Sequence, residues 1–131
     1  MISPGGSPAP ARPQTAPGRV VAVVSDLFFV ARIRETARLA GVPLVFARSA
    51  AEIDAALAEG ARFVLLDLTG AFDYAAVFAA VERAAPPPPV LGYTTHALAR
   101  QTQPWHARCA RVVTKETLTQ ELPALLREGV S

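Results

Sequence analysis

The stretch Phe63-Val64-Leu65-Leu66-Asp67-Leu68-Thr69-Gly70 runs from four apolar residues into a carboxylate and ends on a small hydroxyl residue and a glycine. An unbroken apolar run bounded by turn residues is typical of a strand that is buried on both faces of a parallel sheet. Asp67 then falls where this strand ends, and ligands of open α/β sheets bind at the carboxyl ends of the strands. We therefore predict that Asp67 is the centre of the functional site.

Outward from this strand, apolar runs alternate with segments of helical periodicity. The central strand is predicted at 62–67, and the others at 19–24, 43–47, 90–94 and 110–114. Short connections and right-handed crossovers between such units predict a (βα)5 α/β fold, a doubly wound parallel five-stranded sheet between layers of helices.

Three of the predicted helices contain a capping residue or a proline that bears on where they begin or break. Ser49 begins a capping box, so a helix is expected from about Ala50. A weaker helix over 97–108 is interrupted by a proline. The last helix is predicted to be capped by Thr119, with Pro123 near its first turn, where proline does least harm.

Length and composition indicate one domain with a tail. Residues 1–18 hold five Pro and three Gly, so we predict a disordered tail before one domain over 19–129. No apolar run approaches the ~18 residues of a membrane span, and no secretory signal opens the chain, which favours the cytoplasm. The 13 basic residues are scattered, so neither nucleic acid nor a membrane is expected as a partner. The single cysteine, Cys109, excludes an internal disulfide and is expected to be buried.

Four polar side chains fall at the carboxyl ends of predicted strands: Asp26, Asp67, Thr94 and Lys115. Two carboxylates can hold Mg²⁺, which prefers oxygen ligands and keeps several waters. A carboxylate can also attack phosphorus, and phosphoryl transfer needs its charge neutralised by groups such as a cation, an amine and a hydroxyl. Lys115 is the only lysine beside 12 arginines, which points to a task for a flexible ammonium group.

These strand ends resemble the four motifs of response-regulator receiver domains. The resemblance extends over residues 19–129 and rests on Val23-Val24-Ser25-Asp26, Val64-Leu65-Leu66-Asp67, Pro89-Val90-Leu91-Gly92-Tyr93-Thr94 and Val112-Val113-Thr114-Lys115. It implies a flavodoxin-like, receiver-like three-layer sandwich in which Asp67 is the phosphoacceptor. It also implies that Asp26, Asp67 and the backbone carbonyl of Thr69 bind Mg²⁺. The Thr94 hydroxyl would then move toward the phosphoryl group, and Lys115 would be the conserved cation of the last strand.

By this resemblance the chain is a single-domain signalling protein of a two-component phosphorelay and not an enzyme. Phosphorylation of Asp67 by a histidine kinase would control its contacts with other signalling proteins. A homodimer through the fourth helix, fifth strand and fifth helix is one such contact. Trp105 falls in this region, where it is either an interface anchor or a core residue.

Three positions depart from the receiver pattern, and the loop after Asp67 also lacks the usual proline. Ser25 stands where receivers carry the first of two acids, Glu116 where a proline normally follows the lysine, and Val112 where an aromatic residue is usual. With two carboxylates in place of three, weaker binding of Mg²⁺ is expected. These departures support the alternative of a degenerate pseudo-receiver, a phosphorylation-independent interaction module. A phosphatase of the haloacid dehalogenase type fits less well, because Thr69 stands where that family has a second acid.

The candidate residues also have plain structural alternatives. Asp26 is as well placed to cap the following helix as to bind a metal. Thr94 can be an ordinary turn hydroxyl, and Lys115 a surface charge. His96 and His106 have no partner at metal-ligand spacing, so both are assigned to structure or solvent.

Overall fold

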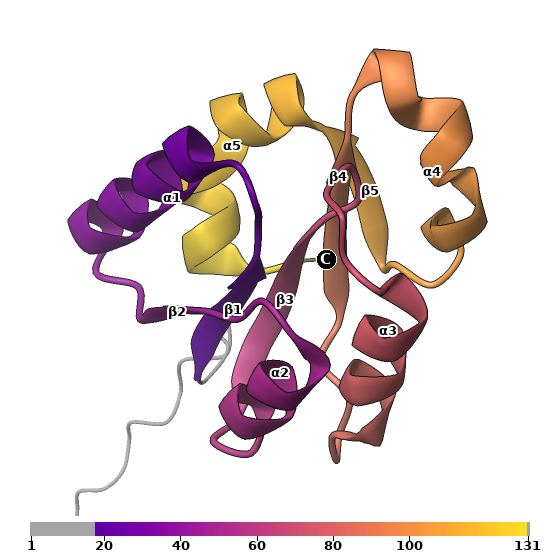
Figure 1. Ribbon diagram of the computed structural model, residues 1–131. Coiled ribbons are helices and arrows are strands. Elements are labelled where there is room, and N and C mark those ends of the chain that lie inside the picture. The colour runs from indigo at the N-terminus through magenta and orange to yellow at the C-terminus, as the bar shows by residue number, and fades with distance from the viewer. Residues whose placement is uncertain (1–17, 131) are drawn as a thin grey trace, which may run out of the picture.

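Five strands and five α-helices alternate along residues 18–130, the part of the chain that the computed structural model describes (Figure 1). The predicted alternation is confirmed, and the predicted tail lies outside the described residues except for its last residue, Gly18. The elements are β1 (Arg19–Val23), α1 (Leu27–Ala40), β2 (Leu44–Phe46), α2 (Ala50–Leu57), β3 (Ala61–Asp67), α3 (Tyr74–Arg83), β4 (Val90–Thr94), the short 3₁₀ helix η2 (His96–Leu98), α4 (Ala99–His106), β5 (Arg111–Thr114) and α5 (Lys115–Glu128).

The five strands form one parallel sheet in the order β2-β1-β3-β4-β5, as the predicted doubly wound fold requires. The central strand β3 pairs with β1 on one side and with β4 on the other, where Asp67 lies opposite Tyr93. Because all five strands run the same way, their carboxyl ends lie along one edge of the sheet. The residues that follow β1, β3, β4 and β5 are thereby brought to the same edge.

Strand β3 is buried between two layers of helices, which explains its unbroken apolar run. Phe63 and Leu65 belong to the core under α1 and α5, whereas Val64 and Leu66 belong to the core under α2 and α3. All four side chains are fully buried. Figure 1 shows α1 and α5 together on one side of the sheet and α2 and α3 on the other.

The last helix begins earlier than the sequence predicted. Helix α5 starts at Lys115, directly after β5, because the Thr114 hydroxyl accepts the N–H of Thr117 at 3.1 Å and caps the helix. Thr119, the predicted cap, lies inside α5 and donates its hydroxyl to the Lys115 carbonyl at 2.8 Å. Pro123 is therefore in the helix interior and not in the first turn, so one backbone hydrogen bond of α5 is missing.

Two smaller predictions have different outcomes. The predicted start of α2 and its Ser49 cap are confirmed, since the Ser49 hydroxyl accepts the N–H of Glu52 at 3.2 Å. The reciprocal bond of a capping box is shifted by one residue, because the Glu52 carboxylate accepts the N–H of Arg48, at 2.7 Å, and not that of Ser49. Cys109 is half-buried and not fully buried, because it lies in the loop after α4, and burial raises the pKa of its thiol to about 11. Within residues 18–130, none of the helices combines the length and the apolar composition needed to cross a bilayer.

Candidate functional site

Asp67 is the last residue of β3 and is only 2% exposed. Its Oδ1 accepts the backbone N–H of Thr69 at 2.8 Å and the Thr69 hydroxyl at 2.6 Å, and its Oδ2 accepts the Ser25 hydroxyl at 3.3 Å. A buried charge is costly unless it is paired or hydrogen-bonded. Among residues 18–130, no ion pair reaches Asp67. Asp67 is thus a buried carboxylate held by hydrogen-bond donors, without a cation.

Asp26 and Lys115 form an ion pair at the same edge of the sheet, with 2.9 Å between Lys115 Nζ and Asp26 Oδ2. The other oxygen, Asp26 Oδ1, accepts the N–H groups of Phe28 and Phe29 at 2.9 and 3.2 Å and so caps α1. The Lys115 hydrogen bond, followed by that from the Phe29 N–H, lowers the pKa of Asp26 below its usual range. Asp26 therefore acts as a helix cap, and its second oxygen holds an ammonium group in the place proposed for a metal.

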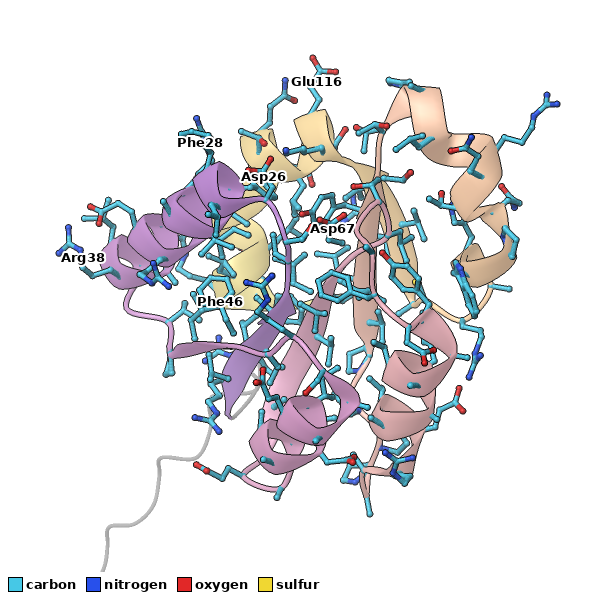
Figure 2. The ribbon with its side chains drawn as sticks, in the orientation of Figure 1. Asp26, Phe28, Arg38, Phe46, Asp67 and Glu116 are labelled. Carbon is cyan, nitrogen blue, oxygen red and sulfur yellow. The ribbon has the colours of Figure 1, made fainter. Side chains whose placement is uncertain are left out.

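Lys115 reaches Asp26 from the first position of α5. A positive charge at a helix N-terminus is unfavourable, and the carboxylate of Asp26 and the ring of Phe29 compensate for it. The Lys115 ammonium lies 4.8 Å from the centre of the Phe29 ring. The structure thus brings Lys115 to Asp26 and not within ion-pair distance of Asp67. Figure 2 shows Asp26 at the start of α1 and Asp67 at the end of β3, near the same edge.

The loop after β3 is organised by the hydroxyl of Tyr74, a residue that no sequence motif singles out. This hydroxyl lies 2.6 Å from the backbone carbonyl of Asp67 and 3.0 Å from both the N–H and the carbonyl of Gly70. Burial raises the pKa of Tyr74 to about 12, so the group is a neutral donor near neutral pH. A Cβ at Gly70 would lie 2.8 Å from Phe72 Cε2 and 2.9 Å from Ser25 Oγ, so a larger residue here would have to displace the Phe72 ring and the hydroxyl that binds Asp67.

Tyr93 is a second residue beside Asp67 that the sequence did not reveal. It is 1% exposed and packs edge-on against Phe29, with 5.3 Å between the ring centres. Its hydroxyl is buried and makes no hydrogen bond within residues 18–130. Burial, together with the negative charge of Asp67, raises the pKa of Tyr93. The site therefore holds a neutral hydroxyl group with unused hydrogen-bonding capacity.

Thr94 is buried and its hydroxyl is directed to α4. The Thr102 hydroxyl lies 3.0 Å from Thr94 Oγ1 and 2.8 Å from His106 Nε2. The three side chains form a hydrogen-bonded row from the end of β4 into α4. His106 accordingly has a structural role, as the sequence suggested, and its partner at the i−4 position on the helix was the signal available.

The sequence left open whether Trp105 is an interface anchor or a core residue, and the structure shows that it packs against the core. Its ring is stacked on Phe78 at 5.8 Å and lies 5.7 Å from Tyr74, both in α3. The side chain is half-buried and joins the core between α3 and α4. This packing leaves no large aromatic free to anchor a partner in that region of the described chain.

The carboxylates at this edge of the sheet determine whether it could bind a metal ion. Two carboxylates are enough for Mg²⁺, which keeps several waters and often takes one or two protein carboxylates. Both oxygens of Asp26 are already engaged, however, so a cation there would replace the Lys115 ammonium. Within residues 18–130, no three His, Cys, Asp or Glu side chains are grouped to hold a metal. The Mg²⁺ ligands Asp26, Asp67 and Thr69 stay a prediction.

Comparison with solved structures shows the fold of receiver domains. The chemotaxis protein CheY4 of Vibrio cholerae is 21% identical, with a TM-score of 0.65, over 85% of this chain and all (100%) of that one. The receiver domain of Ssk1 from Saccharomyces cerevisiae, co-crystallised with the histidine phosphotransfer protein Ypd1, is 13% identical, with a TM-score of 0.57, over 86% and 90% of the chains.

The same fold also occurs without any natural function. A de novo designed Rossmann 2x3 protein matches with a TM-score of 0.60 and 16% identity, over 87% of this chain and 93% of that one. No protein-family model and no curated protein matches the sequence. The flavodoxin-like, receiver-like architecture is thus shown, and an assignment of function rests on the residues at the edge of the sheet.

Proposed function

We propose that this chain is a receiver-like signalling domain in which Asp67 accepts a phosphoryl group. The observation that carries the proposal is the burial of Asp67 at the carboxyl end of the central strand, where no cation among residues 18–130 pairs with it. A fold has no structural need for a lone carboxylate there, because burying an unpaired charge destabilises it. Function accounts for such a residue better than stability does.

Asp67 Oδ2 is the more available nucleophile, because its one hydrogen bond, from Ser25, is the longest of the three that the carboxylate accepts. In the proposed step Oδ2 attacks phosphorus, and the bond from phosphorus to the leaving group breaks. The leaving group departs with the bonding electron pair. Bound Mg²⁺ would neutralise charge on the phosphoryl oxygens, with Asp26 and Asp67 as the residues that hold it.

Lys115 and Tyr93 would supply the remaining stabilisation. The Lys115 ammonium sits on a flexible stem and, on leaving Asp26, would pair with a phosphoryl group on Asp67. The buried Tyr93 hydroxyl would donate to the same oxygens. As to partners, the solved neighbour from yeast is a complex of a receiver domain with a histidine phosphotransfer protein. A phosphohistidine of such a protein or of a histidine kinase is the donor we propose here.

Acetyl phosphate with MgCl₂, followed by mass spectrometry of the intact chain, tests the proposal. We expect an adduct of about +80 Da, one phosphoryl group, that Asp67→Asn abolishes. Asp73→Asn is the matched control: Asp73 is an exposed aspartate in the loop after Asp67 that caps α3, and asparagine is an equally good cap. An unmodified wild-type chain, or an adduct that survives Asp67→Asn, would contradict the proposal.

A second candidate is the degenerate pseudo-receiver, which the pairing of Lys115 with Asp26 favours. In that case the ion pair is a permanent link between α1 and α5, and Ser25 holds Asp67 as part of the structure. The phosphatase alternative lacks a general acid, because the Thr69 hydroxyl in that position donates to Asp67. Absence of the adduct together with intact partner binding by Asp67→Asn would select the pseudo-receiver.

A further inference from the structure

The outer face of α1 carries the exposed apolar surface of this domain. Among residues 18–130, three large apolar side chains are exposed, and all are on α1: Leu27 at 71%, Phe28 at 91% and Leu39 at 71%. Figure 2 shows Phe28 pointing away from the body of the domain at the start of this helix. Exposed apolar groups of this size are typical of a surface that is covered by a partner. The face of α4, β5 and α5, where the sequence placed a homodimer, carries none of them.

Four residues of α1 form one stripe opposite its buried side. Phe28, Arg32, Glu35 and Leu39 follow one another at spacings of four, three and four residues, which places them on one face of a helix. Phe28, Arg32 and Leu39 are exposed, and the Glu35 side chain is 57% exposed. The buried side of the helix is formed instead by Phe29, Ile33 and Ala37. Within residues 18–130, no other element covers the stripe, and its one side-chain ion pair joins Glu35 to Arg38 of the same helix.

This stripe is complementary to itself when the direction of the helix is reversed. Phe28 and Arg32 lie as far before the midpoint of α1 as Leu39 and Glu35 lie after it. In an antiparallel pair of helices, Phe28 thus meets Leu39 of the second copy, and Arg32 meets its Glu35. The two-fold axis makes each contact twice. We propose that α1 is the interface of an antiparallel homodimer, with a second copy of this chain as the occupant of the face.

The surroundings of the stripe fit this partner. A groove runs from Phe28 past Asp26 and Lys115 to the start of α5, with Arg32 and Glu116 in its walls. In the proposed dimer, Leu39 of the second copy would lie at the Phe28 end of this groove. Glu35 already binds Arg38 on its own helix, at 2.6 Å between Arg38 Nη2 and Glu35 Oε2. Both side chains of that pair are more than half exposed, and such surface pairs rearrange at little cost. Glu35 can therefore accept a second guanidinium from the partner.

Sedimentation equilibrium of the full chain, from micromolar to about 1 mM, tests the dimer, since a single-helix interface is small. We expect a reversible dimer. Arg32→Glu and Glu35→Arg should each weaken association at least about tenfold, because each places like charges opposite one another twice. An equimolar mixture of the two variants should dimerise again, because every contact between them is then between opposite charges.

Three controls test whether association depends on α1. Arg100→Glu reverses an exposed arginine of α4 and should leave association unchanged. Thermal unfolding of each variant verifies its fold, and Phe28→Ser provides an independent test that leaves the charges intact. Three results would overturn the proposal. The wild type could be monomeric, or the mixture of the two charge variants could stay monomeric. Alternatively, Arg111→Glu in β5 could weaken the dimer while the substitutions on α1 leave it unchanged. Capture of a different protein on α1 by a chain that is monomeric would also overturn it.

Discussion

Asparagine in place of Asp67 should make the domain more stable. The substitution keeps the size of the side chain and removes its charge. The oxygen of the new amide still accepts the two hydrogen bonds from Thr69, and its nitrogen can donate to the Ser25 hydroxyl, which now accepts. Hydrogen bonds to a neutral acceptor are weaker than those to a carboxylate by roughly 1 kcal/mol each, about 2 kcal/mol for the pair from Thr69. Burial of an ion without a counter-ion costs several kcal/mol. The balance is a gain of about 1–2 kcal/mol.

Urea and thermal unfolding measure this gain. The fluorescence of Trp105, the only tryptophan, reports unfolding because its ring is stacked on Phe78. For a domain of this size, a gain of 1–2 kcal/mol raises Tm by about 4–8 °C. Asp67→Ala is the control, because it leaves the Thr69 N–H without an acceptor and should lower stability by roughly 1–3 kcal/mol. If Asp67→Asn proved less stable than the wild type, the carboxylate would be a net stabilising group. Stability alone would then explain why the chain retains it.

Other perturbations follow from the same geometry. Asp26 has a pKa lowered by its hydrogen bond from Lys115, so its contribution to stability is complete above about pH 4. That contribution is lost as the pH falls through the lowered pKa. The urea midpoint of Asp26→Asn, measured as a function of pH, should therefore fall less in acid than the midpoint of the wild type. Pro123→Ala should restore a hydrogen bond inside α5 and raise the free energy of unfolding by about 1–3 kcal/mol in urea titrations; an unchanged midpoint would contradict this. Gly70→Ala would bring a Cβ to 2.8 Å from Phe72 Cε2 and 2.9 Å from Ser25 Oγ. It should therefore lower Tm and slow any phosphorylation at the neighbouring carboxylate.

Most of the fold was predictable because its signals are local. The apolar run that ends at Asp67 and the cap at Ser49 each act within a few residues. The order of strands and helices follows from them, and parallel pairing follows from that order. The boundary of α5 was not predictable in this way. Thr114 and Thr119 are both suitable caps, and which of them begins the helix depends on the residue at which β5 ends.

The candidate site divides along the same line. Its candidate residues could be chosen from the sequence, because polar residues at the ends of apolar runs are recognisable without a structure. Their pairing was not visible: Lys115 binds Asp26, because α5 begins immediately after β5 and its first residue faces the capped start of α1. The Tyr74 hydroxyl binds the backbone carbonyl of Asp67, and Tyr93 lies opposite Asp67 in the sheet, but the spacing of neither tyrosine in the sequence indicates this.

Local periodicity thus defines which residues are strand, helix and strand end, since each of these depends on neighbours in the chain. The partner of each charge depends on residues up to 89 positions apart, as for Lys115 and Asp26. Such pairs are selected only when the sheet and its helix layers bring their elements together. The Coulomb energy of a pair depends on the distance between the two charges in space and not on their separation along the chain. The tertiary structure therefore decides which charges pair.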